Sequence, residues 1–366
     1  MSDTTTRRLI DAYAQGAADP VMFLTGFFQS PAVNFYNSEE VEIDIIRDDE
    51  DIAIVLEDIS QGYRLNTNDL YTNKSFKPPA YKEAVPINSF DLIKRMPGQD
   101  PFQNPDYRSA VITRMFSAMT LVERKIRRAL ELQAAQILQT GRLTLRDSAG
   151  NSLFTMNFSP KTTHFPTVTT AWTASGSTPL ADLNSLAEVI RNDGLTDPDQ
   201  LIMGIDAYNA FIEHQDVQDA LDNRRMDRGA IVPIENRGGA NYRGTIDIGN
   251  YPFDIWTYGA RYKDPQTNAK TQYIATDKVI MRASSGRMDA TFGAIPNIGQ
   301  LVGAQNAAAA LLPELPGRFS NQAGGMDLFT NAWLTNDGEQ LMAGIGARPL
   351  LIPTAIDTFG CLDVSP

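Results

Sequence analysis

The feature that most constrains this chain is the stretch 104–140, which contains neither proline nor glycine after Pro105. Asn104 is a residue type that caps helix N-termini, and Pro105 suits the first helical position, where no N–H donor is needed. Gly141 follows as a natural helix C-terminus. The pattern predicts one helix over 104–140. At ~1.5 Å per residue it would be about 54 Å long, so we expect a spine helix that crosses a flat or extended molecule.

Four basic residues cluster in the second half of this helix: Arg124, Lys125, Arg127 and Arg128. No aromatic or glycine-rich segment accompanies them, so the cluster does not indicate a platform for stacked bases. Two interpretations remain. The cluster is either a solvated helix face or a basic surface that meets an acidic surface of a neighbouring copy.

An acidic segment near the N-terminus offers such a surface. Between Val41 and Ile45 apolar residues alternate with acidic ones, which predicts a strand with one wet face. A polar turn at 47–51 and an apolar run at 52–56 complete a hairpin pattern. The acidic residues of the turn are Asp48, Asp49, Glu50 and Asp51. The oxygen spacing and central glycine of an EF-hand are missing, so we expect a solvated hairpin or an acidic face that docks onto a basic one.

The residues before this hairpin, 1–40, contain the apolar segment VMFLTGFF. Its aromatic side chains are Phe23, Phe27 and Phe28. Large aromatic side chains need a surface against which to bury. The segment is therefore either an arm laid on a neighbouring subunit or an amphipathic helix in the chain's own core.

The rest of the chain divides into a loop, a second domain and a tail. Prolines punctuate 63–98, which predicts an extended loop without long ladders. After a hairpin at 143–158, the block 178–281 contains helix patterns followed by strand patterns, which predicts an α+β domain. The apolar tail 348–364 is expected to return and pair with the early hairpin, which would make the second domain an insertion.

Composition excludes several function classes. The net charge is -12, opposite in sign to what binding of nucleic acid by phosphate neutralisation requires. Two histidines and one cysteine, Cys361, leave no catalytic constellation, metal site or disulfide. No apolar run approaches the ~18 residues of a membrane span, and no secretory signal is recognisable. We therefore expect no enzyme, no cofactor and no membrane, and a reducing compartment.

Three segments carry a resemblance to a known family: FLTGFF in the arm, Lys74 to Arg108, and LELQAAQILQTGRLTL, from Leu130 to Leu145. Together with the order of elements, they resemble the major capsid proteins of tailed bacteriophages, with the Hong Kong 97-type fold. The local sequence of these segments is most similar to the phage lambda E-type branch of that family.

The resemblance implies an α+β fold with five parts. These are an N-terminal arm (1–40), an extended β-hairpin loop (41–98), a peripheral domain (99–178) with the spine helix 104–140, an inserted axial α+β domain (179–299), and a return to the peripheral domain (300–366). In such a fold the extended loop reaches over a neighbouring subunit. The basic cluster, the acidic turn and the arm aromatics are then candidate contacts between subunits.

The resemblance also implies a function. The chain would form hexamers and pentamers of an icosahedral shell that encloses double-stranded DNA without sequence-specific binding. It implies a separate scaffolding protein, a decoration protein and a portal protein as partners, with a virion location after assembly in the host cytoplasm. The alternatives are a tail-tube or other ring-forming virion protein and, further away, a soluble oligomeric enzyme.

Overall fold

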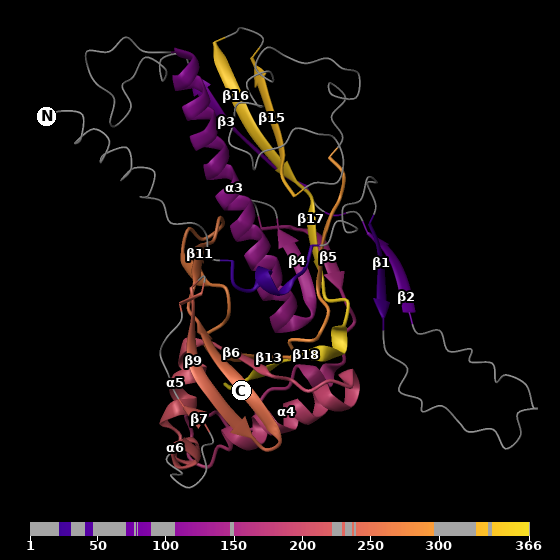
Figure 1. Cartoon of the computed structure of the whole chain (residues 1–366), viewed down its shortest axis with the longest axis vertical. Helices are drawn as coiled ribbons and strands as arrows, with labels where there is room; N and C mark the ends of the chain where they lie inside the picture. The colour runs from indigo at the N-terminus through magenta and orange to yellow at the C-terminus, as the bar shows by residue number, and fades with distance from the viewer. Residues whose placement is uncertain are drawn as a thin grey trace, which may run out of the picture.

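The structure is a computed structural model that describes residues 22–30, 41–46, 71–76, 78, 80–88, 107–146, 150–221, 229–230, 236–237, 239–295, 327–335 and 339–365. The molecule is elongated, and one long helix runs from one end toward its middle (Figure 1). A three-stranded sheet accompanies the helix at that end, and a larger mixed sheet with three helices forms the other end. The α+β class expected from the sequence is confirmed.

The long helix is α3, Tyr107–Thr140. Its 34 residues give a length of about 51 Å at ~1.5 Å per residue. The helix ends as expected, because Gly141 has φ +61° and its N–H donates to the carbonyl of Ile137 over 2.7 Å. The first predicted positions, 104–106, lie outside the described residues.

A three-stranded antiparallel sheet in the order β15-β16-β3 packs along the first half of α3. Its strands are β3 (Tyr81–Asn88), β15 (Phe329–Leu334) and β16 (Gln340–Ala347). The expectation that 63–98 lacks long ladders is wrong for β3, which pairs with β16 along all eight of its residues. Pro86 is tolerated there because β3 is an edge strand of this sheet, where a missing N–H breaks no central ladder.

The predicted early strand is present as β1, Val41–Ile46, and it pairs with a segment that was not predicted to be a strand. β1 pairs antiparallel with β2, Tyr71–Phe76, in a register that runs from Val41↔Phe76 to Ile46↔Tyr71. The expected second strand, 52–56, lies outside the described residues. The sequence of β2, YTNKSF, has no apolar alternation, which is why its pattern did not predict a strand.

The predicted hairpin after the spine is confirmed. β4, Arg142–Arg146, pairs antiparallel with β5, Ser152–Asn157. A short 3-10 helix, η4 (Thr162–His164), then leads into the second half of the molecule.

The larger sheet has the order β18-β13-β6-β10-β9-β7, and β8 also pairs with β9. Its strands are β6 (Gln200–Met203), β7 (Gly229–Ala230), β8 (Asn236–Arg237), β9 (Ala240–Ile248), β10 (Tyr251–Tyr258), β13 (Lys278–Arg282) and β18 (Phe359–Asp363). The helices that pack near it are α4 (Pro179–Gly194), α5 (Ile205–Glu213) and α6 (Gln215–Leu221). The expected α+β block of helices and strands is therefore present.

Two strand pairs and two short helices complete the described chain. They are β11 (Arg261–Lys263) with β12 (Lys270–Gln272), β14 (Asp289–Phe292) with β17 (Pro349–Ile352), η1 (Thr25–Phe27) and η6 (Ile356–Thr358).

The tail does not pair with the early hairpin, so that expectation is corrected. β17 pairs with β14, and β18 joins the larger sheet beside β13. The segment that returns to the first part of the chain is β16, which pairs with β3. The physical reason is burial. Four of the five residues of β18 are buried, which suits a sheet covered on both faces rather than a hairpin with one wet face.

Candidate assembly surfaces

The aromatic segment of the arm packs on the chain's own core. Phe28 is 5% exposed, while Phe23 and Phe27 are partly buried against the same core. The ring of Phe23 lies 5.3 Å from that of Trp256 and 5.7 Å from that of Tyr258, both on β10. Of the two interpretations, the chain's own core accounts for Phe28, which has almost no surface left for a neighbour. Phe23 and Phe27 keep some free surface, and their contact with another subunit stays a prediction.

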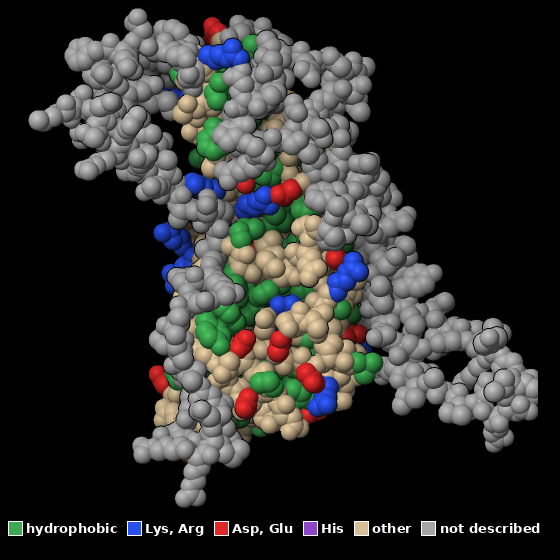
Figure 2. All heavy atoms as spheres, in the orientation of Figure 1, with side chains coloured by type: hydrophobic (Ala, Val, Ile, Leu, Met, Phe, Trp, Pro, Cys, Tyr) green, Lys and Arg blue, Asp and Glu red, His purple; other side chains and the backbone are tan. Residues whose placement is uncertain are grey.

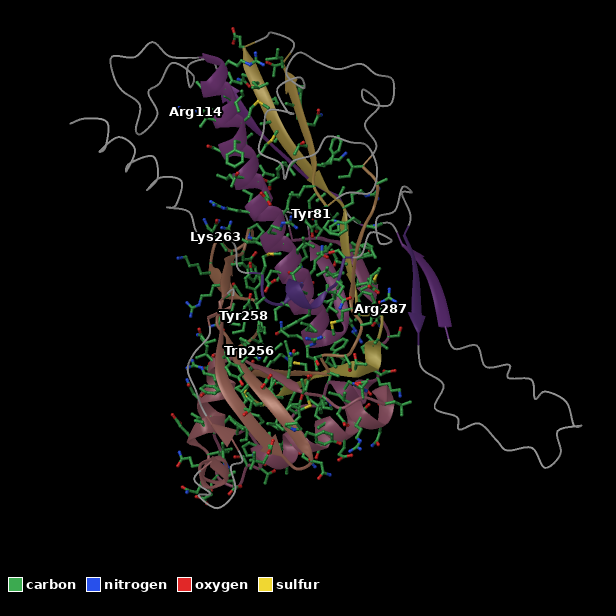
Figure 3. All side chains as sticks on the ribbon, in the orientation of Figure 1. Tyr81, Arg114, Trp256, Tyr258, Lys263 and Arg287 are labelled. Atoms are coloured by element: carbon green, nitrogen blue, oxygen red, sulfur yellow. The ribbon has the colours of Figure 1, made fainter. Side chains whose placement is uncertain are left out.

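A buried carboxylate, Glu131 of α3, holds this segment in place. Its side chain accepts hydrogen bonds from the backbone N–H groups of Leu24 (2.8 Å) and Thr25 (3.0 Å) and from the Thr25 hydroxyl (2.6 Å). The hydroxyl of Tyr258 also donates to it over 2.6 Å. Figure 3 shows Tyr258 beside Trp256, where β10 approaches α3. Burial, and then the Glu131 charge, raise the pKa of Tyr258, which keeps the hydroxyl a donor.

Glu131 was not among the predicted contact residues, although the sequence contains a signal for it. The residue is 0% exposed and shares a helix face with Ala134, Ala135 and Leu138. An acidic residue on the apolar face of a helix needs buried hydrogen-bond donors nearby. That rule could have identified the residue, but not its partners.

The four basic residues of the cluster on α3 differ in their exposure and in their contacts within the chain. Lys125 Nζ lies 2.6 Å from Glu83 of β3, and Arg127 forms a two-pronged ion pair with Asp327. Arg124 is half-buried. Arg128 is exposed and forms no ion pair with any residue that the structure describes. At least two of the four predicted contact residues, Lys125 and Arg127, are therefore already engaged within the chain.

The expected partners of this cluster, Asp48, Asp49, Glu50 and Asp51, lie outside the described residues. Whether they meet the basic cluster of a neighbour stays a prediction.

A second basic surface was not anticipated from the sequence. Arg261, Lys263 and Lys270 are exposed on the β11–β12 pair, and Lys263 lies directly opposite Lys270 in the register. Like charges at directly opposed positions destabilise a strand pair. Lys and Arg side chains gather along the left edge of Figure 2 at the level of β11, and Lys263 lies at the outer edge in Figure 3. Within the described parts of the chain, none of these three cations has an ion-pair partner.

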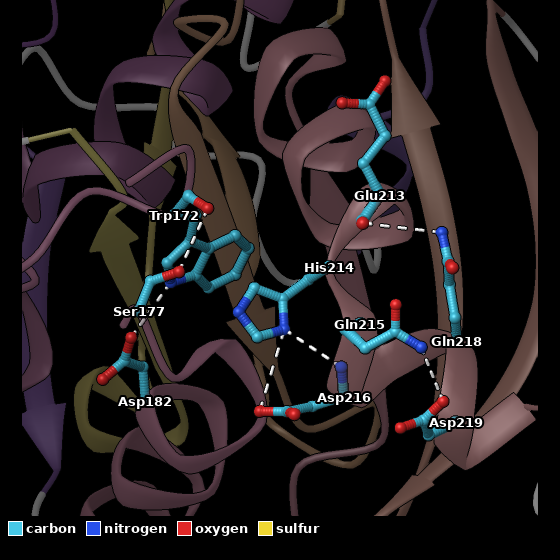
Figure 4. A network of polar contacts seen from close by, with 9 residues as sticks. All are labelled: Trp172, Ser177, Asp182, Glu213, His214, Gln215, Asp216, Gln218 and Asp219. Atoms are coloured by element: carbon cyan, nitrogen blue, oxygen red, sulfur yellow. Dashed lines mark hydrogen bonds and ion pairs between the residues drawn. The ribbon is translucent and has the colours of Figure 1, made fainter. Parts of the chain in front are cut away.

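The two histidines occupy polar networks that hold structure together. His164 lies between a backbone carbonyl and Asp193. His214, at the junction of α5 and α6, accepts a hydrogen bond from the backbone N–H of Asp216 over 3.3 Å (Figure 4). In the same view Trp172 donates to Asp182 over 3.0 Å. Both histidine rings therefore contact groups that lie within the fold of the chain.

An open cavity of about 800 Å³ lies between α5 and the β11–β12 pair. Carboxylates and cations both line it, among them Asp206, Arg261 and Lys270. Among the described residues, no group of His, Cys, Asp or Glu side chains could hold a metal ion. Burial raises the pKa of the Cys361 thiol to about 12, so it is a weak nucleophile. None of the helices in the described parts is long and apolar enough to cross a membrane.

Comparisons with known proteins identify the family. A family model described as phage major capsid protein E matches residues 5–360. A solved structure from E. coli CFT073, assigned to a prophage capsid, covers 97% of this chain and 98% of its own at 15% identity, with a TM-score of 0.63. A phage-related protein of Bordetella bronchiseptica RB50 covers 97% and 96% at 12% identity, with a TM-score of 0.49. No curated protein matches the chain.

The likeness to the E. coli structure gives the fold, which is the Hong Kong 97-type capsid fold expected from the sequence. The family match spans nearly the whole chain, from the arm to the last strand. The chain therefore belongs to the phage major capsid protein E family.

Proposed function

We propose that copies of this chain assemble as hexamers and pentamers into an icosahedral shell that encloses double-stranded DNA. The observation that carries this proposal is the family match over residues 5–360. A shell of many identical copies is stabilised by summing contacts that are individually weak. The proposal includes a location in the virion after assembly in the host cytoplasm.

The partners in this proposal are other copies of the chain, a separate scaffolding protein, a decoration protein and a portal protein. The DNA is enclosed rather than bound, because the net charge of -12 disfavours strong contact with phosphates. Titration of assembled shells with free duplex DNA at several salt concentrations tests this point. Tight binding that weakens steeply with salt would contradict it.

Electron microscopy of the purified protein separates the function classes. A shell protein gives closed particles, or rings of five and six copies. A tail-tube protein gives stacked rings, and a soluble enzyme gives a discrete small complex with turnover. Either of the last two results would refute the proposal.

The contact that we propose between copies joins the exposed Arg128 of one copy to the acidic turn 48–51 of its neighbour. Lys125 and Arg127 contribute less, because Glu83 and Asp327 of their own chain already pair with them. The partly exposed rings of Phe23 and Phe27 are part of the same proposal. Phe28 is not, because its own chain buries it.

Charge reversal tests this contact. Arg128→Glu should reduce the yield of closed particles severalfold while the helical content of the chain stays unchanged. Lys125→Glu is the matched control, since it lies on the same helix but should mainly disturb the contact with Glu83 within the chain. Changing Asp48 and Asp49 to Lys in the Arg128→Glu background should restore particles. An unchanged yield for Arg128→Glu would remove this residue from the interface.

A further inference from the structure

The hairpin of β11 and β12 is a basic element in an acidic protein. The net charge of the chain is -12, whereas this hairpin exposes Arg261, Lys263 and Lys270. Lys263 lies directly opposite Lys270 in the register, and like charges in that position destabilise a strand pair. A pair of only two strands is marginally stable by itself. The three cations therefore do not serve the stability of the hairpin.

The carboxylate in the turn of the hairpin does not compensate these cations. Asp264 accepts hydrogen bonds from the backbone N–H of Gln266 and from the hydroxyl of Thr267, each over 3.0 Å. These two hydrogen bonds and, to a smaller extent, the nearby charge of Arg146 lower the pKa of Asp264. The turn itself thus engages the carboxylate. Among the residues that the structure describes, none forms an ion pair with the three hairpin cations.

Two exposed arginines from other elements extend this charge. Arg146 is the last residue of β4, and its charge acts on Asp264. Arg128 of α3 lies near Tyr273, the residue after β12. Burial and Glu131 raise the pKa of Tyr273, and the charge of Arg128 opposes them. We call the five cations that α3, β4 and the hairpin bring together the basic surface: Arg128, Arg146, Arg261, Lys263 and Lys270.

The strand β1 carries a matching pattern of negative charge. Glu42 and Asp44 are separated by one residue, so the period of two places both on one face of β1, about 6.6 Å apart. Arg261 and Lys263 have the same spacing on one face of β11. Two strands that lie side by side can therefore bring both carboxylates opposite both cations.

A single copy does not join these two elements. Figure 1 shows β11 on one side of the molecule and the β1–β2 pair on the opposite side. A contact between two different surfaces of identical copies is heterologous, and it forms a ring when the rotation between copies closes. The proposed hexamers and pentamers need a contact of this type. DNA is a poorer occupant, because the net charge of the chain repels it.

We propose that the basic surface is the docking site for the acidic face of β1 from a neighbouring copy, with Glu42 and Asp44 facing Arg261 and Lys263. This inference rests on the proposed function, since it assigns one contact within the rings of the shell. It continues the contact proposed for Arg128, because residue 47 alone separates β1 from the acidic turn 48–51.

Charge reversal on the hairpin tests the docking site. Arg261→Glu combined with Lys263→Glu should lower the yield of closed particles by about tenfold or more, because like charges that meet across an interface oppose association. The melting temperature of the unassembled chain should not fall, since the new carboxylate at position 263 lies opposite Lys270 and attracts it. A lower melting temperature together with fewer particles would assign these cations to the fold of the chain and would overturn the proposal.

A charge swap identifies the partner. Adding Glu42→Lys and Asp44→Lys to the reversed hairpin should restore the particles. The matched control adds Asp219→Lys and Asp247→Lys instead, at exposed positions of α6 and β9. Both sets return the net charge to that of the wild type, but only the first should restore assembly. Equal rescue by the two sets would reduce the effect to net charge and would overturn the proposal.

Cross-linking tests the contact directly. In closed particles of Asp44→Cys with Lys263→Cys, a short bismaleimide should join copies into covalent oligomers of up to five or six. Asp44→Cys with Lys82→Cys, at an exposed position of β3, is the matched control and should stay monomeric. The natural Cys361 is buried. Closed particles without cross-links, or a wild-type particle yield for the reversed hairpin, would overturn this inference and leave the shell function standing. A wild-type chain that never forms particles would refute both.

Discussion

Replacing Glu131 with glutamine should detach the arm from the spine helix. The carboxylate is 0% exposed and accepts from two backbone N–H groups and two hydroxyls. An amide has one acceptor oxygen, and its NH₂ group must face one of the two backbone donors. The hydroxyls of Thr25 and Tyr258 can rotate to accept, but a backbone N–H cannot. One buried N–H group, of Leu24 or Thr25, is therefore left unpaired.

The magnitude follows from these contacts. An unpaired buried N–H costs about 1–3 kcal/mol. The remaining hydrogen bonds lose their charge-assisted strength, which adds about 1 kcal/mol. A neutral amide is easier to bury than a carboxylate and offsets part of the loss. We expect Glu131→Gln to lower the free energy of unfolding by about 2–3 kcal/mol on these terms.

Urea unfolding of unassembled protein, followed by circular dichroism and tryptophan fluorescence, measures this loss. Trp256 reports on the arm directly, because its ring lies 5.3 Å from that of Phe23. The matched control is Glu83→Gln on β3, because its half-exposed ion pair with Lys125 is worth at most about 1 kcal/mol. The reasoning is refuted if Glu131→Gln unfolds at the wild-type urea concentration, or if the control loses as much.

Gly141→Ala should lower the melting temperature by several degrees, because φ is +61° and a Cβ atom would clash with the side chain of Pro160. Arg348→Lys should make the chain more susceptible to proteolysis near residue 78, since Nε and Nη2 both donate to the Pro78 carbonyl (3.2 and 3.0 Å) and an ammonium cannot reproduce that fork. Cys361 should resist thiol reagents at pH 8 until urea unfolds the chain. Its pKa is raised to about 12 in the folded chain, so only a fraction of ~10⁻⁴ is thiolate at pH 8. That fraction grows as the pH rises toward the pKa.

The elements that the sequence predicted are those whose cause is local. The spine helix was predictable because 107–140 lacks proline and glycine and Gly141 supplies the left-handed end. The β4–β5 hairpin was predictable because turn-forming residues separate two apolar runs. In each case the determining residues lie within a few positions of one another.

The elements that were not predicted from the sequence are strands that depend on pairing with segments far away in the chain. β2 is polar and becomes a strand only beside β1, and β3 accommodates Pro86 only because it lies at a sheet edge. The apolar pattern of the tail correctly predicted a strand. Its residues do not indicate that this strand, β18, pairs with β13 rather than with the early hairpin. The basic cluster was predictable because its four charges are close in sequence. Its partners within the chain were not, because Glu83 is 42 residues from Lys125 and Asp327 is 200 residues from Arg127.

Buried polar residues define the relative placement of the parts of this molecule. Glu131 joins the spine helix to the arm and to Tyr258, which is 127 residues away. Arg348, between β16 and β17, donates to the Pro78 carbonyl, 270 residues away. Apolar contacts favour burial but are not directional, so packing alone would permit small rotations of the two ends about α3. Hydrogen bonds with fixed geometry remove that freedom. A closed shell is built from copies that keep a defined internal shape, so a loss at Glu131 or Arg348 should disturb assembly even where the chain still folds.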